Sequence, residues 1–388
     1  MSIKTAAIIG AGMAGLTAAL ALARHGIRCD IFEQAPQLAE VGAGLQISPN
    51  ASRILAELGA LDEIERHWSE PDRVRLVSGV TLKQLAAVPT GSFARKRWGA
   101  PYGVMHRSTL QQALLTQVLH NPLCRLHLGH RVEPADHTAI AEITGTPSDL
   151  LVGADGAWSS VRKLIEGRPD IGFSGNIAWR FTVPAAVAPA FLDPSNVTAF
   201  LGPNSHLVAY PLKEIDGFNI VAIAAGMDPG ETWGTEGSAG QRALLLRQFA
   251  GWNMEICTLL ASLERATFWP LYEASDGRWQ NGRDTVLIGD AAHAMMPFSA
   301  QGAAMAIEDA FELAGEVSGP LPLPEALARF EATRKARAAR VRHRGAFNKF
   351  VYHARGPIRL GRDMVLLLRS PESLAGDLDW LYGYHAKG

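Results

Sequence analysis

The chain has 388 residues, which predicts two domains or one elaborated domain and not a single small core. Hydrophobic residues make up 47% of the chain and charged residues 19%, a balance typical of a globular protein and not of a disordered or fibrous one. The formal net charge of -1 excludes the strong basic excess that usually accompanies nucleic-acid binding.

The most basic segment is Arg334–Arg344, where cations recur at helical spacing. Because such runs usually form the solvated face of a helix, we interpret this one in that way and expect no nucleic-acid partner.

The spacing of the cysteines and the distribution of apolar residues indicate the cellular compartment of the protein. Cys29, Cys124 and Cys257 are widely spaced and odd in number, so we expect neither a disulfide framework nor a metal site. No cleavage-type signal is seen at the N-terminus, and no run reaches the roughly 18 apolar residues of a membrane helix. We therefore expect a cytoplasmic protein without a membrane span, either a monomer or a homodimer.

The N-terminal segment predicts a strand–turn–helix–strand unit. Thr5–Ile9 is a short apolar run that ends in glycine, as a buried parallel strand does. A helical pattern that includes Leu16 and Leu20 follows it and ends near Gly26, before a second predicted strand at Arg28–Phe32. The crossover rule predicts that the two strands are parallel and joined in the right-handed sense.

The rest of the chain alternates between β-rich and helical segments. From about Pro71 to Tyr102 we expect short strands and loops. Further strands are predicted at residues 125–128, 150–152, 178–183, 197–201, 206–212, 219–224 and 285–288. Helices are predicted at residues 109–119, 241–252 and 301–316, and in the C-terminal third after a linker with Pro320, Pro322 and Pro324.

A glycine-rich turn lies between the first strand and the first helix. Gly10-Ala11-Gly12-Met13-Ala14-Gly15 has the Gly-x-Gly-x-x-Gly spacing of a dinucleotide site. Gly10 permits the tight turn, Gly12 lets a pyrophosphate approach the backbone, and Gly15 allows close helix–strand packing. Glu33, at the end of the second strand, can accept hydrogen bonds from ribose hydroxyls. We predict cofactor contacts at Gly10, Gly12, Ala14, Gly15 and Glu33, with NAD and FAD both open at this point.

Further motifs resemble a known family. Leu151–Arg162 (LVGADGAWSSVR) is similar to the Asp-Gly motif of the FAD-dependent aromatic hydroxylases, and Leu287–His293 (LIGDAAH) to their Gly-Asp motif. Pro297–Ala303 (PFSAQGA), Gly42-Ala43-Gly44 and His106-Arg107 extend the resemblance over nearly the whole chain. It looks closest to the branch with salicylate hydroxylase, 3-hydroxybenzoate 6-hydroxylase and 6-hydroxynicotinate 3-monooxygenase.

The resemblance implies FAD as the cofactor and an α/β fold, with a discontinuous Rossmann-like FAD-binding domain, an inserted β-sheet substrate domain and a helical C-terminus. The expected bounds are residues 1–70, 103–170 and 276–320 for the FAD-binding domain, 71–102 and 171–275 for the substrate domain, and 321–388 for the helical segment.

Asp290 and the helix after it are the parts that we expect to hold the flavin. Asp290 follows a buried strand, at the end where α/β sheets bind ligands, and its carboxylate can accept hydrogen bonds from ribityl hydroxyls. Gly302 and Ala303 open a helix whose positive end stabilises negative charge on a reduced flavin.

The resemblance implies four more cofactor positions and one structural residue. Arg107 contacts FAD from the start of a helix, Asp155 lies near the pyrophosphate, Pro297 places its carbonyl near the flavin edge, and Ala43 lies in a glycine turn. His293 holds the turn of the Gly-Asp motif and is not expected to transfer protons.

The implied reaction is hydroxylation of a small hydroxyaromatic acid. NADH or NADPH reduces FAD, and O2 then forms a flavin C4a-hydroperoxide that attacks the ring. No second complete dinucleotide turn is present, so we expect the nicotinamide to bind transiently. A flavoprotein reductase, another flavoenzyme of the same fold and a non-catalytic FAD-binding protein remain as alternatives.

One strand supplies the predicted catalytic pair. His206 and Tyr210 in the stretch His206–Pro211 share a sheet face, because strand residues alternate in direction. They match the His-x-x-x-Tyr pattern of the family branch and are our predicted catalytic residues, since a phenol must lose its proton to be activated. Arg180 either binds a substrate carboxylate or forms a structural ion pair. Gln46 is expected near the flavin or the substrate.

Overall fold

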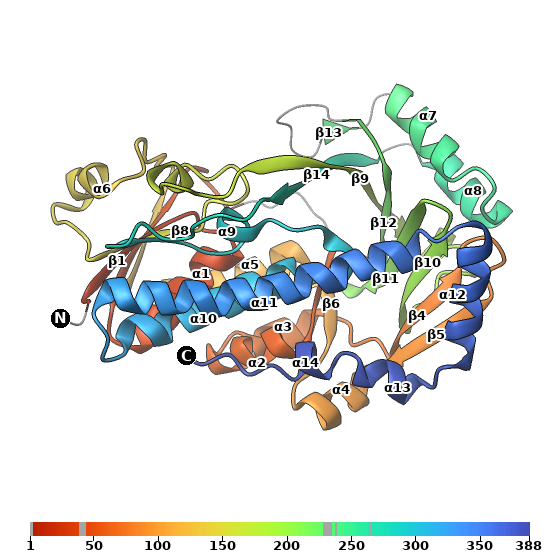
Figure 1. Ribbon diagram of the computed structural model, residues 1–388, viewed down its shortest axis with the longest axis horizontal. Coiled ribbons are helices and arrows are strands. Elements are labelled where there is room, and N and C mark those ends of the chain that lie inside the picture. The colour runs from red at the N-terminus through yellow and green to blue at the C-terminus, as the bar shows by residue number, and fades with distance from the viewer. Residues whose placement is uncertain (1–2, 39–43, 228–234, 237–238, 264–265) are drawn as a thin grey trace.

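A computed structural model describes residues 3–38, 44–227, 235–236, 239–263 and 266–388 (Figure 1). A five-stranded sheet contains β1 (Thr5–Ile9), β2 (Arg28–Glu33), β7 (Cys124–Leu128), β8 (Leu150–Gly153) and β15 (Thr285–Leu287). The strands lie in the order β15-β8-β1-β2-β7, and all of the neighbours are parallel. This is the sheet expected of a Rossmann-like domain, and it brings the ends of β1, β8 and β15 side by side.

Helices cover this sheet because its strands are apolar on both faces. Ala6 and Ile8 of β1 belong to a core shared with α1 (Met13–Arg24), α5 (Arg107–His120) and α10 (Gly302–Ser318). Ala7 and Ile9 point to the opposite face and join a second core. In Figure 1, α1 and α10 lie beside the β1 and β8 region.

An eight-stranded mixed sheet forms the other half of the molecule. Its strands are β4 (Arg73–Ser78), β5 (Gln84–Pro89), β9 (Ile171–Pro184), β10 (Asn196–Gly202), β11 (Ser205–Leu212), β12 (Gly217–Ala225), β13 (Thr235–Glu236) and β14 (Thr267–Ala274). Their order is β13-β14-β9-β12-β11-β10-β4-β5. One face packs under α7 (Ala239–Gln248) and α8 (Met254–Ser262), so the other face is free to form the wall of a site.

The remaining elements connect the two halves. Strands β3 (Gly44–Ile47) and β6 (Gly103–His106) form an antiparallel pair. The other helices are α2 (Pro49–Glu57), α3 (Leu61–His67), α4 (Gly91–Trp98), α6 (His137–Thr144), α9 (Asp290–His293), α11 (Leu323–Tyr352), α12 (Gly356–Leu368), α13 (Pro371–Gly376) and α14 (Asp379–Tyr382). The 3-10 turns are η1 (Val161–Leu164), η2 (Ala185–Val187), η3 (Lys213–Ile215) and η4 (Pro297–Ser299). The long helix α11 runs along the molecule from the β1 side toward β11 (Figure 1).

The predicted α/β fold class is confirmed, with differences in individual elements. Helix α4 lies within the segment from Pro71 to Tyr102, where only strands and loops were expected. Pro324 belongs to the first turn of α11 and not to a linker, because proline is tolerated where the helix has no hydrogen bond for its N–H to make. Among the described helices, none has both the length and the apolar character needed to span a bilayer.

The interpretation of Arg334–Arg344 as a solvated helix face is wrong at its start. Arg334 is 0% exposed and Arg337 is 7% exposed, because both face α10. Arg334 donates to Asp309 Oδ1 at 2.7 Å and to Glu308 Oε2 at 2.8 Å. Arg337 donates to Glu308 Oε1 at 2.8 Å. The carboxylates that neutralise this basic face lie in a helix more than twenty residues earlier, where charge spacing alone could not reveal them.

Candidate active site

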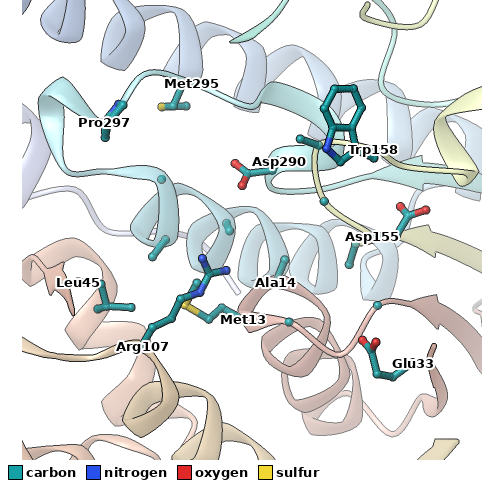
Figure 2. Close-up of a pocket in the computed structure, with 18 of the residues that line it drawn as sticks. Met13, Ala14, Glu33, Leu45, Arg107, Asp155, Trp158, Asp290, Met295 and Pro297 are labelled. Carbon is teal, nitrogen blue, oxygen red and sulfur yellow. The ribbon is translucent and has the colours of Figure 1, made fainter. Parts of the chain in front are cut away.

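A cavity of about 740 Å³ lies between the two sheets (Figure 2). The predicted site residues that line it are Gly10, Gly12, Ala14, Glu33, Arg107, Asp155, His206, Tyr210, Asp290, Pro297, Gly302 and Ala303. Gly15 is not part of the lining, and Ala43 lies outside the described residues. Figure 2 shows Glu33 and Asp155 at one end of the cavity and Leu45 and Pro297 at the other, with Asp290 between them.

The glycine turn has the geometry of a phosphate cradle. Gly10 has a φ of +102°, and a Cβ there would lie 2.5 Å from the carbonyl oxygen of Ala154. At Gly15 a Cβ would lie 1.9 Å from the carbonyl oxygen of Gly10, so helix and turn touch through bare backbone. A Cβ at Gly12 would meet nothing within 4 Å, which leaves open space at the N-terminus of α1. A pyrophosphate fits this space, where N–H groups and the helix dipole favour an anion.

Glu33 closes the same turn. Its carboxylate accepts hydrogen bonds from the backbone N–H groups of Ala11 at 3.0 Å and Ala35 at 2.9 Å. Each carboxylate oxygen has a further lone pair, so these bonds leave Glu33 able to accept a ribose hydroxyl from the cavity that it lines.

Asp155 and Arg162 tie the Asp-Gly motif to the Gly-Asp motif. Asp155 accepts hydrogen bonds from the Ser160 backbone N–H at 2.7 Å and from the Ser159 hydroxyl at 2.5 Å, which fixes the turn before η1. Arg162 is buried and donates to the carbonyl oxygens of Ala291 at 2.8 Å and Asp290 at 3.2 Å. Arg162 therefore holds α9 in place from inside the protein.

Asp290 is exposed to the cavity at the first position of α9. The N-terminus of α10 lies in the same wall, where Gly302 and Ala303 face the cavity. A carboxylate acceptor, a positive helix end and a phosphate cradle thus surround one space. This donor and acceptor set fits the ribityl chain, ring and pyrophosphate of FAD.

His293 has the structural role expected for it. Its Nε2 lies 2.5 Å from Asp309 Oδ2, and the same oxygen accepts the Gly289 N–H at 2.9 Å. Burial alone would raise the pKa of Asp309, but His293 and Arg334 hold this pKa well below its usual value. The ionised Asp309 therefore stabilises the Gly-Asp turn, and His293 points into this buried network.

The free face of the eight-stranded sheet forms the far wall. Register pairing places Arg180 opposite Val221 and Val221 opposite Val208, while Tyr210 and His206 flank Val208 on β11. At the usual rise per residue, His206 and Tyr210 are about 13 Å apart along the strand. Arg180 lies two strands, or roughly 10 Å, across the sheet from Val208. Val208 and Val221 therefore form an apolar floor for the cavity on this face, and an imidazole, a phenol and a guanidinium lie around it.

His206 and Tyr210 are both deeply buried, at 1% and 2% exposure. Burial and the neighbouring His353 hold the pKa of His206 well below its usual value, so this imidazole is neutral near pH 7. Burial raises the pKa of Tyr210, an effect that Arg180 partly opposes. Tyr210 also packs against Gly44, where a Cβ would lie 2.7 Å from its ring.

Arg180 forms no ion pair with any residue that the structure describes, so the structural alternative for it is not supported. Its guanidinium lies 5.1 Å from the ring centroid of Trp269, and its Nε is buried without a hydrogen-bond partner. Burial lowers its pKa, although arginine remains charged at any physiological pH. A half-buried cation that lines a cavity with a buried Nε left without a hydrogen-bond partner is suited to bind an anion.

Gln46, a residue of β3, was expected near the flavin or the substrate. It lines the cavity, and its Oε1 accepts a hydrogen bond from the Tyr102 hydroxyl at 2.5 Å. His353 was not predicted: it follows α11 and lies 2.9 Å from His206, a contact between residues 147 positions apart that no local pattern signals.

Comparison with known proteins shows to which family the chain belongs. A family model described as an FAD binding domain matches residues 3–344. A 3-amino-4-hydroxybenzoate 2-monooxygenase of Streptomyces platensis is 35% identical over 393 residues, covering 98% of this chain and 96% of the relative. A 3-hydroxybenzoate 6-hydroxylase of Aquipseudomonas alcaligenes is 34% identical over 391 residues, covering 97% and 96%. The chain belongs to the FAD-dependent aromatic hydroxylases.

Solved structures agree at the level of the fold. A salicylate hydroxylase in complex with its substrate matches this hydroxylase with a TM-score of 0.79 and 23% identity, covering 99% of this chain and 96% of the other. Klebsiella pneumoniae HpxO with FAD and uric acid matches with a TM-score of 0.80 and 23% identity, covering 97% and 95%. The protein is thus a flavoprotein monooxygenase with FAD as cofactor, and NAD(P)H is the electron donor of its family.

Proposed function

We propose that this hydroxylase acts on a single aromatic ring with a carboxylate and a phenolic hydroxyl, as in the hydroxybenzoates. The observation that supports this most directly is Arg180, a half-buried cation without a carboxylate partner among the described residues, on the wall that also presents His206 and Tyr210. A carboxylate satisfies Arg180, and the apolar floor of Val208 and Val221 accepts the ring. The named relatives act on hydroxybenzoates and an aminohydroxybenzoate.

The protein's own residues would prepare the substrate for attack. Arg180 fixes the carboxylate and so the orientation of the ring. His206, neutral near pH 7, accepts the phenolic proton, which makes the ring electron-rich. Tyr210 keeps its proton because burial raises its pKa, so it can donate a hydrogen bond to the substrate at a point away from His206. When bound, the reduced flavin activates O2 for transfer to this ring.

We also propose how the cofactor is held. Gly10, Gly12, Ala14 and Gly15 form the pyrophosphate turn, and Glu33 contacts the ribose. Asp155 is the proposed contact near the pyrophosphate. Toward the flavin, the proposed contacts come from Ala43, Arg107, Asp290, Pro297, Gly302 and Ala303. The choice between NADH and NADPH, a cytoplasmic location and a monomeric or homodimeric state stay predictions.

An oxidation assay tests the proposed function. Purified FAD-loaded enzyme is mixed with NADH or NADPH and a panel of hydroxybenzoates and hydroxypyridine carboxylates, and oxygen use and hydroxylated product are both measured. We expect at least one hydroxybenzoate to stimulate oxidation and to yield product. Stimulation without product would favour a reductase, and no stimulation by any aromatic acid would contradict the proposal.

Two variants test the site within the same assay. His206→Ala and Tyr210→Phe should lower the yield of product per NAD(P)H oxidised while the flavin absorbance stays that of the wild type. Wild-type yields in both variants would remove these residues from the mechanism.

A further inference from the structure

His206 has a histidine as its hydrogen-bond partner. Its Nδ1 lies 2.9 Å from Nε2 of His353, the residue that ends α11, and the two ring centroids are 5.1 Å apart. Phe298 and Tyr352 complete the packing, at 5.0 Å and 5.3 Å from the His206 ring. The imidazole pair is therefore held in one geometry by rings on three sides.

The partner is unusual for a buried base. A catalytic imidazole is commonly oriented by a carboxylate or a backbone carbonyl, which accepts a hydrogen bond but does not pass a proton on at neutral pH. Cationic groups lie around this pair: Lys349 acts on His353, Arg344 acts on the adjacent Tyr352, and Arg362 of α12, itself paired with Asp363, donates to the carbonyl oxygen of Val351. Lys349 lies close enough to lower the pKa of His353, while the neighbours of His206 on β10 and β12 are Leu201 and Ile223.

The two histidines differ in burial, which gives the pair a direction. His206 lines the substrate cavity and is 1% exposed, whereas His353 is partly exposed and is not among the residues lining the cavity. The carbonyl of His353 accepts the backbone N–H of Asn204 at 3.2 Å, so the end of α11 is fixed against the turn before β11. The hydrogen bond thus leads from the interior of the site toward solvent.

We propose that His353 is a positioning and relay residue that takes the substrate's phenolic proton from His206 and releases it to water. The substrate O–H bond breaks as an N–H bond forms on Nε2 of His206. The Nδ1–H bond of His206 then breaks as one forms on Nε2 of His353, and His353 loses its Nδ1 proton to water. This inference rests on the proposed function, because it requires a phenolic substrate beside His206.

The lowered pKa values of both histidines favour passing a proton on and disfavour holding it. Burial, aided by Lys349, lowers the pKa of His353 to about 4, and burial also depresses the pKa of His206. Both rings are therefore neutral near pH 7, and neither keeps a proton that reaches it. The relay would set the rate at which the bound phenol ionises, whereas the surroundings of the phenol in the cavity would set the equilibrium extent of ionisation.

Ionisation of a reporter phenol tests the relay without turnover. FAD-loaded enzyme is mixed rapidly with a hydroxynitrobenzoate, whose phenolate absorbs visible light, in the absence of NAD(P)H. In His353→Gln, which keeps polarity but does not relay, we expect phenolate formation to slow by about tenfold or more. The final extent of ionisation should stay near that of the wild type. His353→Ala should be slow as well and should recover in part when imidazole is added to the buffer.

His343→Gln is the matched control, because His343 is an exposed histidine of α11 that does not line the cavity. It should ionise the probe at the wild-type rate. Equal rates in His353→Gln and the wild type, or a slow variant that added imidazole and buffer do not rescue, would overturn the relay in favour of a packing role. Failure of the proposed function is seen separately, as absence of hydroxylated product in the wild-type assay.

Discussion

At the scale of single residues, Arg180 is the position to which the proposed function assigns the choice of substrate class. Its side chain is half-buried and lines the cavity, and it has no carboxylate partner among the described residues. A hydrogen bond to a charged group stabilises a complex by about 1.5–3 kcal/mol. Because Arg180→Gln would lose such a bond to the substrate carboxylate, it should raise the KM for a hydroxybenzoate roughly 10- to 150-fold. Steady-state kinetics on the carboxylate checks this expectation.

The corresponding carboxamide supplies the control for that measurement. A neutral amide makes no ion pair, so its weaker binding should change little between the wild type and Arg180→Gln. Flavin absorbance reports whether FAD remains bound in the variant. If KM rises equally for acid and amide, Arg180 shapes the cavity and does not select a charge.

Site residues could be located from the sequence only where a motif marks their positions. The glycine turn and Asp290 could be located because each directly follows a strand, and His206 and Tyr210 because their spacing matches a pattern of the family branch. Arg180 could not be decided from sequence, because the choice between substrate and ion pair depends on whether a carboxylate from another strand reaches it. His353 gave no signal at all, since its partner is far away in the chain.

At the scale of elements, the contact between α10 and α11 offers a comparison of a buried and an exposed ion pair. Arg334 is buried among Glu308, Asp309 and Glu312 of α10. Arg334→Met should lower the free energy of unfolding by about 3–5 kcal/mol, because it leaves carboxylates buried without their cation. Urea denaturation followed by circular dichroism measures the change.

Arg329 is the matched control, since it pairs with Glu316 across the same two helices but is 53% exposed. Arg329→Met should cost no more than about 1 kcal/mol. A loss of similar size in the two variants would mean that burial does not govern this contact.

Strands were easier to foresee than helices in this chain. Buried strands such as β1 and β8 show as short apolar runs, and β10 to β12 are recognisable by their many apolar and β-branched residues. The short helix α4 was missed because one or two turns give too few residues for a period to show. The domain bounds drawn from the sequence stay predictions, although the strands of each sheet fall within them.

At the scale of the whole molecule, stability should fall on mild acidification. A histidine in the unfolded chain binds a proton near pH 6.5, whereas burial lowers the pKa of folded His353 to about 4. Between these values the unfolded state binds more protons, so stability rises with pH and is lost as the pH falls from about 6.5 to 4. His206 acts in the same direction. Thermal denaturation at pH 7.5 and pH 5 should show a lower midpoint at pH 5.

His353→Gln removes one of the groups that cause this loss. The difference between its midpoints at the two pH values should be smaller than that of the wild type, while His343→Gln should retain the full difference. A His353→Gln midpoint that falls as steeply as the wild-type midpoint would show that other groups dominate the acid response.

The length of α11 places a constraint on the enzyme that no single side chain reveals. At about 1.5 Å per residue, its 30 residues extend over roughly 45 Å. Near its middle Arg334 and Arg337 bind the carboxylates of α10, and just past its C-terminal end His353 contacts His206. Removing one residue between these two contacts would turn everything beyond it by about 100°. Homologous chains that keep both contacts should therefore keep the number of residues between them, even where the residues themselves have diverged.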